Sequence, residues 1–390
     1  MIRNISVGID VGTHTTRVVV SEFFKNDPMP HIIGMGSSQS YGLRHGYITN
    51  IHLASESIKK AVKVAEESSH IRIKRAFVSV GGVSLESVVS TGSTIISRAD
   101  TEITTIDIKK AISNSAENLS IQNRKIIDTI PLYYKLDGKE VLGNPFGMKG
   151  IKLEVKTLFI ICLSQHIEDL ISAVADAGVE TIDVIASPTA ASTIVLQDRH
   201  KIAGCVLINI GAETVSIAVF ENSILVSLHI FSIGSTDITN DIALGLKIPL
   251  DEAENVKVGV ANYNSYSKKK VDEIIEARLS DIFELVEKHL KKMNRSGLLP
   301  AGAIITGGGS HINEIEEISK VMLRLPSRIG SADSFVNEKI KPKDSSWFVA
   351  LGLCIAGKNS LQNEMSEHSL KNTIKNIKKS FGSMIKQILP

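Results

Sequence analysis

The chain has 390 residues, of which 43% are hydrophobic and 22% charged, and its formal net charge is +2. This length predicts more than one packed unit, and the ordinary composition excludes a largely disordered chain. The near-neutral charge gives no reason to expect a nucleic-acid partner, and none is predicted. No run of about 18 uncharged apolar residues occurs, so any contact with a membrane is expected to be peripheral.

The first element expected is a β-hairpin close to the N-terminus. An apolar run at Ile5–Ile9 leads into a turn at 10–13, and a second apolar run follows at Thr16–Ser21. Two such runs joined by a short turn are typical of antiparallel strands. Apolar residues then recur at helical spacing over Ala54–Glu67, which predicts a helix, and Ala76–Val80 reads as a further strand.

Residues 83–160 differ in character from the sequence around them. Three β-rich runs surround one stretch with helical periodicity, Ile106–Asn118; the runs are Ser87–Ser97, Ile126–Tyr134 and Ile151–Leu163. This pattern predicts a small α+β module inserted between two parts of a larger fold.

The second half of the chain repeats the opening pattern. After a helix expected over Ile167–Ala177, a strand at Cys205–Ile210, a turn at 211–214 and a strand at Val215–Phe220 form a second hairpin. Two hairpins of one design, about 200 residues apart, predict a duplicated architecture. The elements expected after them are helices over Ser235–Leu244, Leu250–Val258 and Val271–Lys291 and a strand over Ala303–Thr306.

Three turns rich in glycine and threonine follow predicted strands, at 10–15, 209–214 and 306–310. Small residues let backbone N–H groups approach phosphate oxygens, and hydroxyl groups add donors. One such turn alone is usually an ordinary hairpin turn. Three of them, with the third expected to open a helix, predict a nucleotide site between the two halves of the fold. The sequence contains neither a P-loop nor a dinucleotide-binding G-x-G-x-x-G after a strand.

These turns resemble the nucleotide-binding loops of the actin superfamily. The matching segments are GIDVGTHTTRVVV and LINIGAETVSIAVF for two phosphate loops, AIITGGGSHI for the adenosine motif and WFVALGLCIAG for the last connecting helix. Other segments resemble the FtsA family of bacterial cell-division proteins in particular: HGYITNI, FVSVGGVSLES, NPFGMKGIKLEV and SIGSTDITNDIALGLKIPLDEAENVKV. The resemblance spans essentially the whole chain.

The resemblance implies an α/β, actin-like two-lobed ATPase fold with a duplicated ribonuclease-H-like core, an inserted subdomain 1C and a C-terminal amphipathic helix. The implied division is 1A over 1–82, 163–199 and 345–357; 1C, an SHS2-like insertion, over 83–162; 2A over 200–240 and 299–344; 2B over 241–298; a linker over 358–368; and a membrane-targeting helix over 369–390.

The resemblance also implies an ATP and Mg²⁺ site. Asp10 would face Mg²⁺ through water, because a hard dication prefers oxygen ligands. The residues that would hold phosphate are Asp10, Gly12, Thr13, His14, Thr15, Arg17, Gly211, Ala212 and Thr214. Those that would approach ribose and adenine are Gly234, Glu254, Lys257, Gly307, Gly308 and Gly309. Glu254 and Lys257 alone could equally be an ordinary surface ion pair.

The chain departs from the superfamily pattern in the second turn. The usual Asp-x-Gly-Gly-Gly-Thr is Asn209-Ile-Gly-Ala212-Glu213-Thr here, and Glu213 would repel phosphate unless it points away. The match to the usual water-orienting Gln or Glu is Ser187, which is a poorer base. We therefore expect no catalytic residue and, at most, a weak ATPase.

The C-terminal tail carries a second signal. On a helix from Ser369 to Leu389, apolar residues form one stripe, with lysines on its flank and no acid after Glu367. This pattern is typical of a helix lying in the surface of anionic phospholipid, although a helix packed on the protein itself is the alternative. The predicted membrane contacts are Leu370, Ile374, Ile377, Lys378, Phe381, Ile385, Lys386 and Ile388.

The family resemblance implies a structural function. The chain is expected to polymerise on the cytoplasmic face of the bacterial inner membrane at the division site, to bind the C-terminal peptide of FtsZ, for which Arg278 is a candidate contact, and to recruit other division proteins. Two alternatives stay open: a pilus assembly protein similar to PilM, which would lack the basic tail, and a sugar or acetate kinase of the same superfamily, which would place a substrate-binding aspartate in the cleft.

Overall fold

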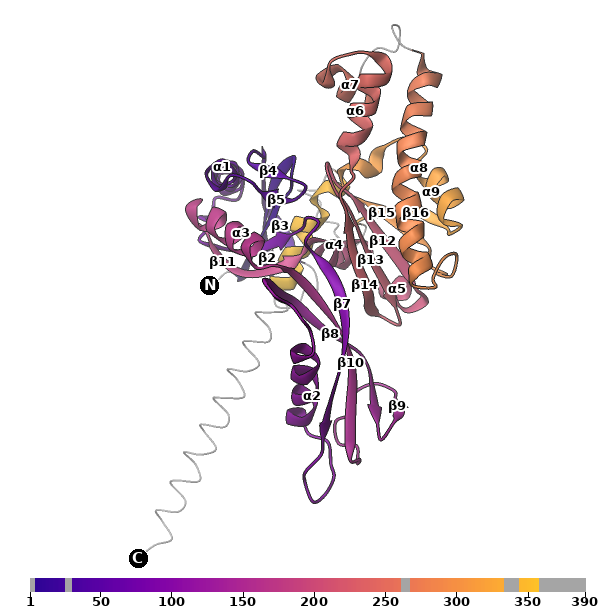
Figure 1. Cartoon of the computed structure of the whole chain (residues 1–390). Helices are drawn as coiled ribbons and strands as arrows, with labels where there is room; N and C mark the ends of the chain where they lie inside the picture. Colours follow the sequence, from indigo (N-terminus) through magenta and orange to yellow (C-terminus); the bar gives the residue numbers. More distant parts are fainter. Residues whose placement is uncertain (1–3, 25–29, 261–266, 333–343, 358–390) are drawn as a thin grey trace, which may run out of the picture.

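Two five-stranded sheets of the same design form the cores of two lobes, in a computed structural model that describes residues 4–24, 30–260, 267–332 and 344–357 (Figure 1). The predicted linker and the tail, with all its proposed membrane contacts, lie outside these residues. Within the described residues, no helix combines the length and apolar character needed to span a bilayer.

The first lobe is built from three segments of the chain. Its elements are β1 (Asn4–Val11), β2 (Thr15–Phe23), β3 (His31–Gln39), β4 (Leu43–Arg44), β5 (Tyr47–Ile48), α1 (Ile51–Ser69), β6 (Arg75–Val80), α3 (Ser164–Asp176), β11 (Glu180–Ala186), α4 (Ser187–Val195), the 3₁₀ helix η3 (Ser345–Trp347) and a helix over 348–357. The inserted module contains β7 (Glu86–Ile95), α2 (Thr105–Glu117), β8 (Arg124–Leu136), β9 (Lys139–Val141) and β10 (Lys152–Leu163).

The second lobe is built from the later part of the chain. Its elements are α5 (Asp198–Ala203), β12 (Cys205–Ile210), β13 (Val215–Glu221), β14 (Ile224–Phe231), α6 (Ser235–Leu246), α7 (Leu250–Lys257), α8 (Lys268–Lys292), β15 (Ala303–Thr306), the 3₁₀ helix η2 (Gly308–His311), α9 (Ile315–Leu323) and β16 (Ser327–Ile329). The hairpins predicted from the sequence are β1–β2 and β12–β13.

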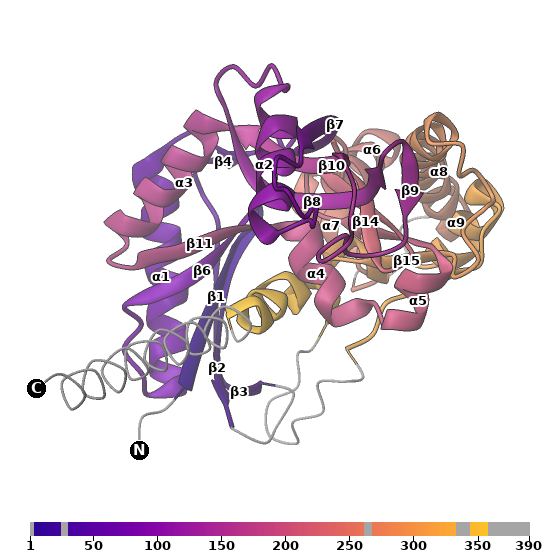
Figure 2. The same cartoon turned by 90° about the horizontal axis from the view of Figure 1, so that it is seen from below.

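The strand orders show the predicted duplication directly. The first sheet runs β11-β6-β1-β2-β3 and the second β16-β15-β12-β13-β14. In each, the first strand pairs antiparallel with the next strand on one side and parallel with a later strand on the other. Figure 2 shows α1 and α3 on one face of the first sheet and the helix over 348–357 on the opposite face.

Alternation along β12 gives the second sheet two buried faces. Leu207 belongs to the hydrophobic core shared with the first lobe, whereas Val206 and Ile208 belong to a separate core beneath α6, α8 and α9. Successive side chains of a strand point to opposite faces, so one strand can serve both cores. The helix α4 packs against strands of both sheets and therefore joins the lobes.

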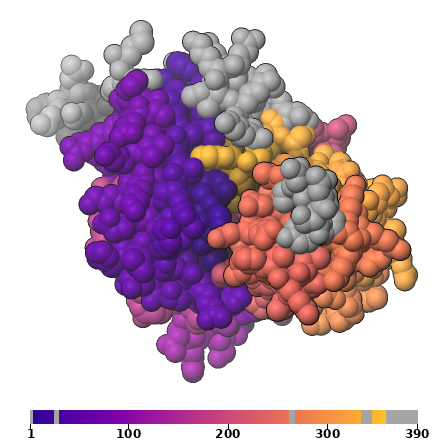
Figure 3. Space-filling model, turned by 90° about the horizontal axis from the view of Figure 1, so that it is seen from above, coloured from indigo at the N-terminus to yellow at the C-terminus, as the bar shows by residue number. Residues whose placement is uncertain are grey.

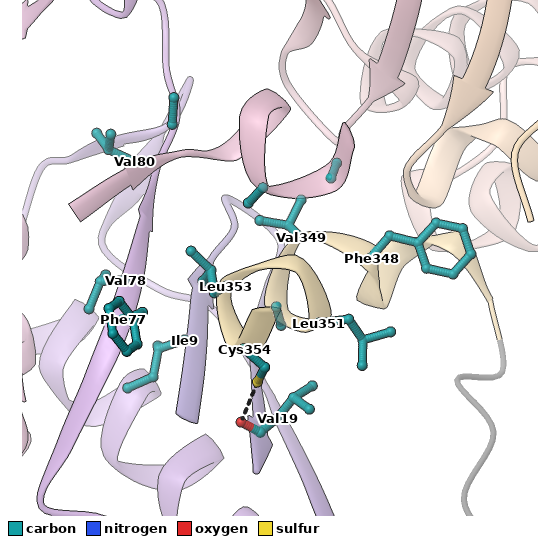
Figure 4. Close-up of a cluster of buried hydrophobic side chains, with 14 of the residues drawn as sticks. Ile9, Val19, Phe77, Val78, Val80, Phe348, Val349, Leu351, Leu353 and Cys354 are labelled. Carbon is teal, nitrogen blue, oxygen red and sulfur yellow. Dashed lines mark hydrogen bonds between the residues drawn. The ribbon is translucent and has the colours of Figure 1, made fainter. Parts of the chain in front are cut away.

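The helix over 348–357 closes the first lobe. Its side chains pack among those of β1, β2 and β6, as Figure 4 shows, and the thiol of Cys354 lies 3.5 Å from the carbonyl oxygen of Val19. A Cβ at Gly8 would lie 2.3 Å from the carbonyl oxygen of Ala350. Backbone therefore touches backbone here, and only glycine fits at position 8.

The inserted module is a four-stranded sheet, β7-β10-β8-β9, covered on one face by α2. It also touches the second lobe. The hydroxyl of Ser87 on β7 donates to the carbonyl oxygen of Leu228 at 3.0 Å and accepts from the Leu228 N–H at 2.8 Å. The module is therefore tied to both lobes.

A pair of stacked histidines lies beside this contact. The rings of His229 on β14 and His289 on α8 are 5.1 Å apart and nearly parallel, and Ser227 lies within hydrogen-bond distance of His289 at 2.9 Å. Burial, together with His229 and Lys292, lowers the pKa of His289 from 6.5 to about 4. The folded protein therefore holds His289 neutral in a range where an unfolded chain would protonate it.

We expect a matched pair of glycine substitutions to have opposite effects. Gly8→Ala should lower the free energy of unfolding by about 1–3 kcal/mol, because its Cβ meets rigid backbone. Gly245→Ala in α6 should be neutral or stabilising by up to about 1 kcal/mol, because its Cβ meets the mobile end of Ile274 and alanine favours a helix. Denaturant unfolding of both variants tests this, and equal effects would contradict the packing described.

The free energy of unfolding should also fall as the pH drops from about 6.5 to about 4. Over this range His289 is protonated in the unfolded chain but stays neutral in the folded protein. Melting temperatures across this range should decline less steeply in His289→Gln than in the parent protein. His52→Gln, an exposed histidine on α1, is the control and should keep the parent slope. Identical slopes in all three proteins would show that the half-buried ring of His289 does not govern this dependence.

Candidate functional site

A cavity of about 390 Å³ lies between the lobes, where the turns of hairpins β1–β2 and β12–β13 face each other. The two lobes lie side by side in the view from above (Figure 3). The cavity is lined by all but one of the residues predicted to bind nucleotide: Asp10, Gly12, Thr13, His14, Thr15, Arg17, Gly211, Ala212, Thr214, Glu254, Lys257, Gly307, Gly308 and Gly309. The structure thus brings together residues that are up to about 300 positions apart in the sequence.

Asp10 lies near the end of β1, partly buried at the wall of the cavity. The hydroxyl of Ser79 on β6 donates to its carboxylate at 2.6 Å. Desolvation nevertheless raises the pKa of Asp10, against the effects of Ser79 and of Arg17. A partly buried carboxylate with so few donors is suited to a cation, which would stabilise its charged form.

Arg17 on β2 supplies the positive charge predicted for the first turn. Its guanidinium carbon lies 5.6 Å from the ring centre of Trp347, a cation–π contact that holds the side chain at the cavity wall. Thr13 in the same turn accepts a hydrogen bond from the Gly46 N–H at 3.1 Å. The hydroxyl proton of Thr13 therefore remains available for a phosphate oxygen.

The second turn is anchored on helix α6. The Ser235 and Thr236 N–H groups donate to the carbonyl oxygens of Gly211 and Ala212 at 2.9 and 2.8 Å. Gly234 itself does not line the cavity, whereas Ser235 and Thr236 do. A Cβ at Gly234 would lie 2.3 Å from the Ala212 oxygen, so the structure accounts for this glycine by its contact with the second turn.

Glu213 points away from the cavity. Its negative charge is therefore not directed at the place where phosphate is expected to bind. Its carboxylate accepts a hydrogen bond at 2.5 Å from the backbone N–H of His45, at the tip of the β4–β5 hairpin. Asn209, the other unusual residue of this turn, does line the cavity, and its side-chain oxygen lies close against Gly307.

Glu254 and Lys257 form an ion pair at 2.7 Å on the cavity side of α7. The Lys257 side chain is only 7% exposed and also donates to Thr239 at 2.8 Å. Burial opposes ionisation of Glu254, but hydrogen bonds from Lys257 and Thr239 outweigh it and lower the pKa of Glu254. Lys257 is thus held in a fixed position at the cavity wall, whereas the side chain of its partner Glu254 is 48% exposed.

The third turn opens the 3₁₀ helix η2, and the next α-helix, α9, begins only at Ile315. Gly307 has a φ of +89°, in the left-handed region that favours glycine. Ser345 ties this turn to the first lobe, donating to the Gly307 carbonyl oxygen at 2.8 Å. Thr306 also lines the cavity, and its buried hydroxyl has no partner, so it offers a ligand one free polar group.

The residues that line the cavity fit a nucleotide with a bound cation. Among the described residues that line the cavity, Asp10 and Glu254 carry the only carboxylates. In the described part of the chain, no group of three or more metal-ligating side chains could hold a metal unaided. A cation here would therefore need ligand oxygens beside Asp10, as phosphate and water provide.

Sequence reasoning missed several cavity residues. Ser187, weighed only as a water-orienting residue, lies at the start of α4 and lines the cavity. Also unpredicted are Gly46, Ser79, Ser235, Thr236, Thr306, His311, Asn313, Ser345 and Ser346. The small-residue character of FVSVGGVS and DSSW was the available signal, but neither segment follows the pattern of a phosphate turn.

Arg278 lies outside this cavity, on α8. It pairs with Asp241 at 2.6 Å and with Asp281 at 3.3 Å, and its side chain is 29% exposed. The hydrogen bond with Asp241 raises the pKa of Arg278 further. Its guanidinium is thus engaged within the second lobe, while part of it remains at the surface.

Comparison with known proteins agrees with the architecture. The model of the family described as "Cell division protein FtsA" matches residues 206–352, and that described as "SHS2 domain inserted in FTSA" matches residues 82–161. The Cell division protein FtsA of Borreliella burgdorferi is 31% identical over 380 residues, covering 91% of each chain. That of Bacillus subtilis is 30% identical, covering 89% of this chain and 82% of its own.

Solved structures share the fold at much lower identity. The structure of a PilM–PilN type IV pilus biogenesis complex matches with a TM-score of 0.68 at 15% identity, covering 90% of this chain and 98% of that one. MreB5 of Spiroplasma citri bound to AMPPNP matches with a TM-score of 0.52 at 13% identity, covering 96% and 98%. These likenesses show the actin-like fold, and the sequence relatives show that this chain belongs to the FtsA family of cell-division proteins.

Proposed function

We propose that this chain binds ATP with Mg²⁺ in the interlobe cavity. The observation that carries the proposal is the convergence of three Gly/Thr-rich turns on one cavity that is also lined by the carboxylate of Asp10. The structure of a fold neighbour, MreB5 of Spiroplasma citri, holds AMPPNP. Asp10 and the turn hydroxyls would hold the metal and phosphates, and Glu254, Lys257 and the third turn would border ribose and adenine.

The bound Mg²⁺ would neutralise phosphate charge, and the residues of the chain would bind and orient the nucleotide. Hydrolysis is expected to be slow for two reasons. Ser187 is a weak base for an attacking water, and Asn209 brings an amide where the superfamily has a carboxylate. Nucleotide would then act by favouring one interlobe arrangement and so tune assembly.

We further propose that the chain polymerises on the cytoplasmic face of the inner membrane at the division site. There the tail would bind anionic lipid. The second lobe near Arg278 would bind the C-terminal peptide of FtsZ, and the chain would recruit other division proteins. The family membership supports this role. The subdomain division given above also remains our proposal, and the separate sheet between Glu86 and Leu163 supports it for 1C.

The two rival functions differ in what they require. In the described part of the cavity, Asp10 accepts from Ser79 and is the carboxylate proposed for Mg²⁺, and Glu254 is paired with Lys257, which leaves no carboxylate for a sugar substrate. A function in pilus assembly would not need the basic amphipathic tail. Both observations favour the division role.

Asp10→Asn should lower the affinity for Mg²⁺–ATP by on the order of tenfold or more, because the amide keeps the Ser79 contact but loses the charge. Isothermal titration with ATP, with and without Mg²⁺, measures this, and Asp183→Asn on β11 is the control. ATP turnover by the parent protein should stay below about one per minute. Faster turnover that is lost in Asp10→Asn would overturn the weak-ATPase proposal.

Vesicle flotation tests the tail. The full chain should float with vesicles that contain anionic lipid and stay in solution with purely zwitterionic vesicles, because several lysines each add up to about 1 kcal/mol near an anionic surface. A chain truncated after Glu367 should float with neither. If the truncated chain floats as well, the membrane contact lies elsewhere in the protein.

A further inference from the structure

The tip of the β4–β5 hairpin faces both phosphate turns at once. His45 and Gly46 have φ values of 48° and 81°, so both residues of this two-residue turn lie in the left-handed region. Their successive N–H groups donate to different lobes. That of His45 reaches the Glu213 carboxylate at 2.5 Å, and that of Gly46 reaches the Thr13 hydroxyl at 3.1 Å.

The hairpin is fixed to the first lobe. A Cβ at Gly46 would lie 2.4 Å from the Cα of Gly82, and the Gly46 backbone is hydrogen-bonded to His166. The ring of Tyr47 lies 4.7 Å from that of His166. Because backbone touches backbone at Gly82, the tip cannot shift without moving its surroundings in the same lobe.

Glu213 is fixed to the second lobe just as firmly. The backbone on its N-terminal side carries the two hydrogen bonds from the start of α6, and the Gly211 N–H donates to the Thr214 carbonyl oxygen at 2.8 Å across the turn. The Glu213 carbonyl oxygen also lies 3.2 Å from Nδ1 of His45. The contact between Glu213 and His45 therefore joins the two lobes directly beside the phosphate turns.

The chemistry of this contact is specific. A carboxylate that accepts a backbone N–H makes a charge-assisted hydrogen bond, stronger than one between neutral groups. The Glu213 side chain is 30% exposed, so water screens the bond only in part. The same carboxylate, if released, would lie close to the phosphates and repel them.

We propose that Glu213 is an interlobe latch that holds the two phosphate turns together before a nucleotide arrives. The identification of these turns as phosphate-binding rests on the proposed function, but the latch itself does not. A site closed in advance does not need the γ-phosphate to draw the lobes together. The latch should therefore narrow the difference in affinity between ATP and ADP.

Deuterium uptake by peptides that span residues 40–50 tests the latch in the nucleotide-free full chain. Glu213→Ala should raise the exchange rate at the tip by on the order of tenfold, because the His45 amide loses its charged acceptor. Glu213→Gln keeps an acceptor of the same shape and should stay nearer to the parent protein. Glu276→Ala, which removes an exposed carboxylate from α8 in the same lobe, should leave the tip unchanged.

The nucleotide-free comparison separates failure of the latch from failure of ATP binding. If Glu213→Ala exchanges at the tip no faster than the parent protein and Glu276→Ala, there is no latch, whatever the protein binds. If exchange at the tip rises as expected, titrations with Mg²⁺–ATP and Mg²⁺–ADP follow. The ratio of ATP affinity to ADP affinity should be larger in Glu213→Ala than in Glu213→Gln. An unchanged ratio would overturn the link between latch and nucleotide discrimination.

Discussion

Close approach of backbone to backbone, at places where no side chain fits, is the constraint on which this structure depends. A Cβ at Gly12 would lie 2.7 Å from the Thr15 carbonyl oxygen, and one at Gly234 would lie 2.3 Å from that of Ala212. A Cβ at Gly307 would lie 2.5 Å from the Ile210 carbonyl oxygen. These glycines bring N–H groups and small hydroxyls to the cavity wall, which is the environment that phosphate requires. Substitution of Gly12 would distort the first turn itself, and substitution of Gly234 or Gly307 would push one segment away from its neighbour.

The duplicated sheets explain why three such turns meet. Each sheet places its first hairpin at its centre, so the two hairpin turns face each other when the lobes pack on α4 and on the helix over 348–357. The third turn follows β15, which lies parallel to β12, and therefore reaches the same edge of the second sheet. The cavity is thus a consequence of topology, and Asp10, Glu254 and Lys257 then give it charge.

Much of the secondary structure could be predicted from the sequence, because it depends on local patterns of apolar residues. The two hairpins, the inserted module and the helices α1, α2 and α8 each have a clear apolar period. The strand β3 was not predicted, because Gly34 and Gly36 weaken the sequence pattern typical of a strand. The helix α1 packs closely on this strand: a Cβ at Gly36 would lie 2.3 Å from the carbonyl oxygen of Ala61, so only glycine fits there.

What depends on contacts between distant segments was not predictable. The sequence indicated that Glu213 would repel phosphate unless it pointed away, but its partner His45 lies 168 residues earlier in the chain. The contact of Ser79 with Asp10 and the role of Gly234 beneath the second turn are of the same kind. Such roles arise only when the lobes close on each other.

The central proposal is that a nucleotide lies in this cavity with its base against the third turn. Photolabelling with 8-azido-ATP, followed by peptide mapping, tests this placement most directly. Labelled peptides are expected from residues 253–260 and 307–313, with the label displaced by excess Mg²⁺–ATP. Labelling confined to other surfaces, or label that ATP does not displace, would contradict it.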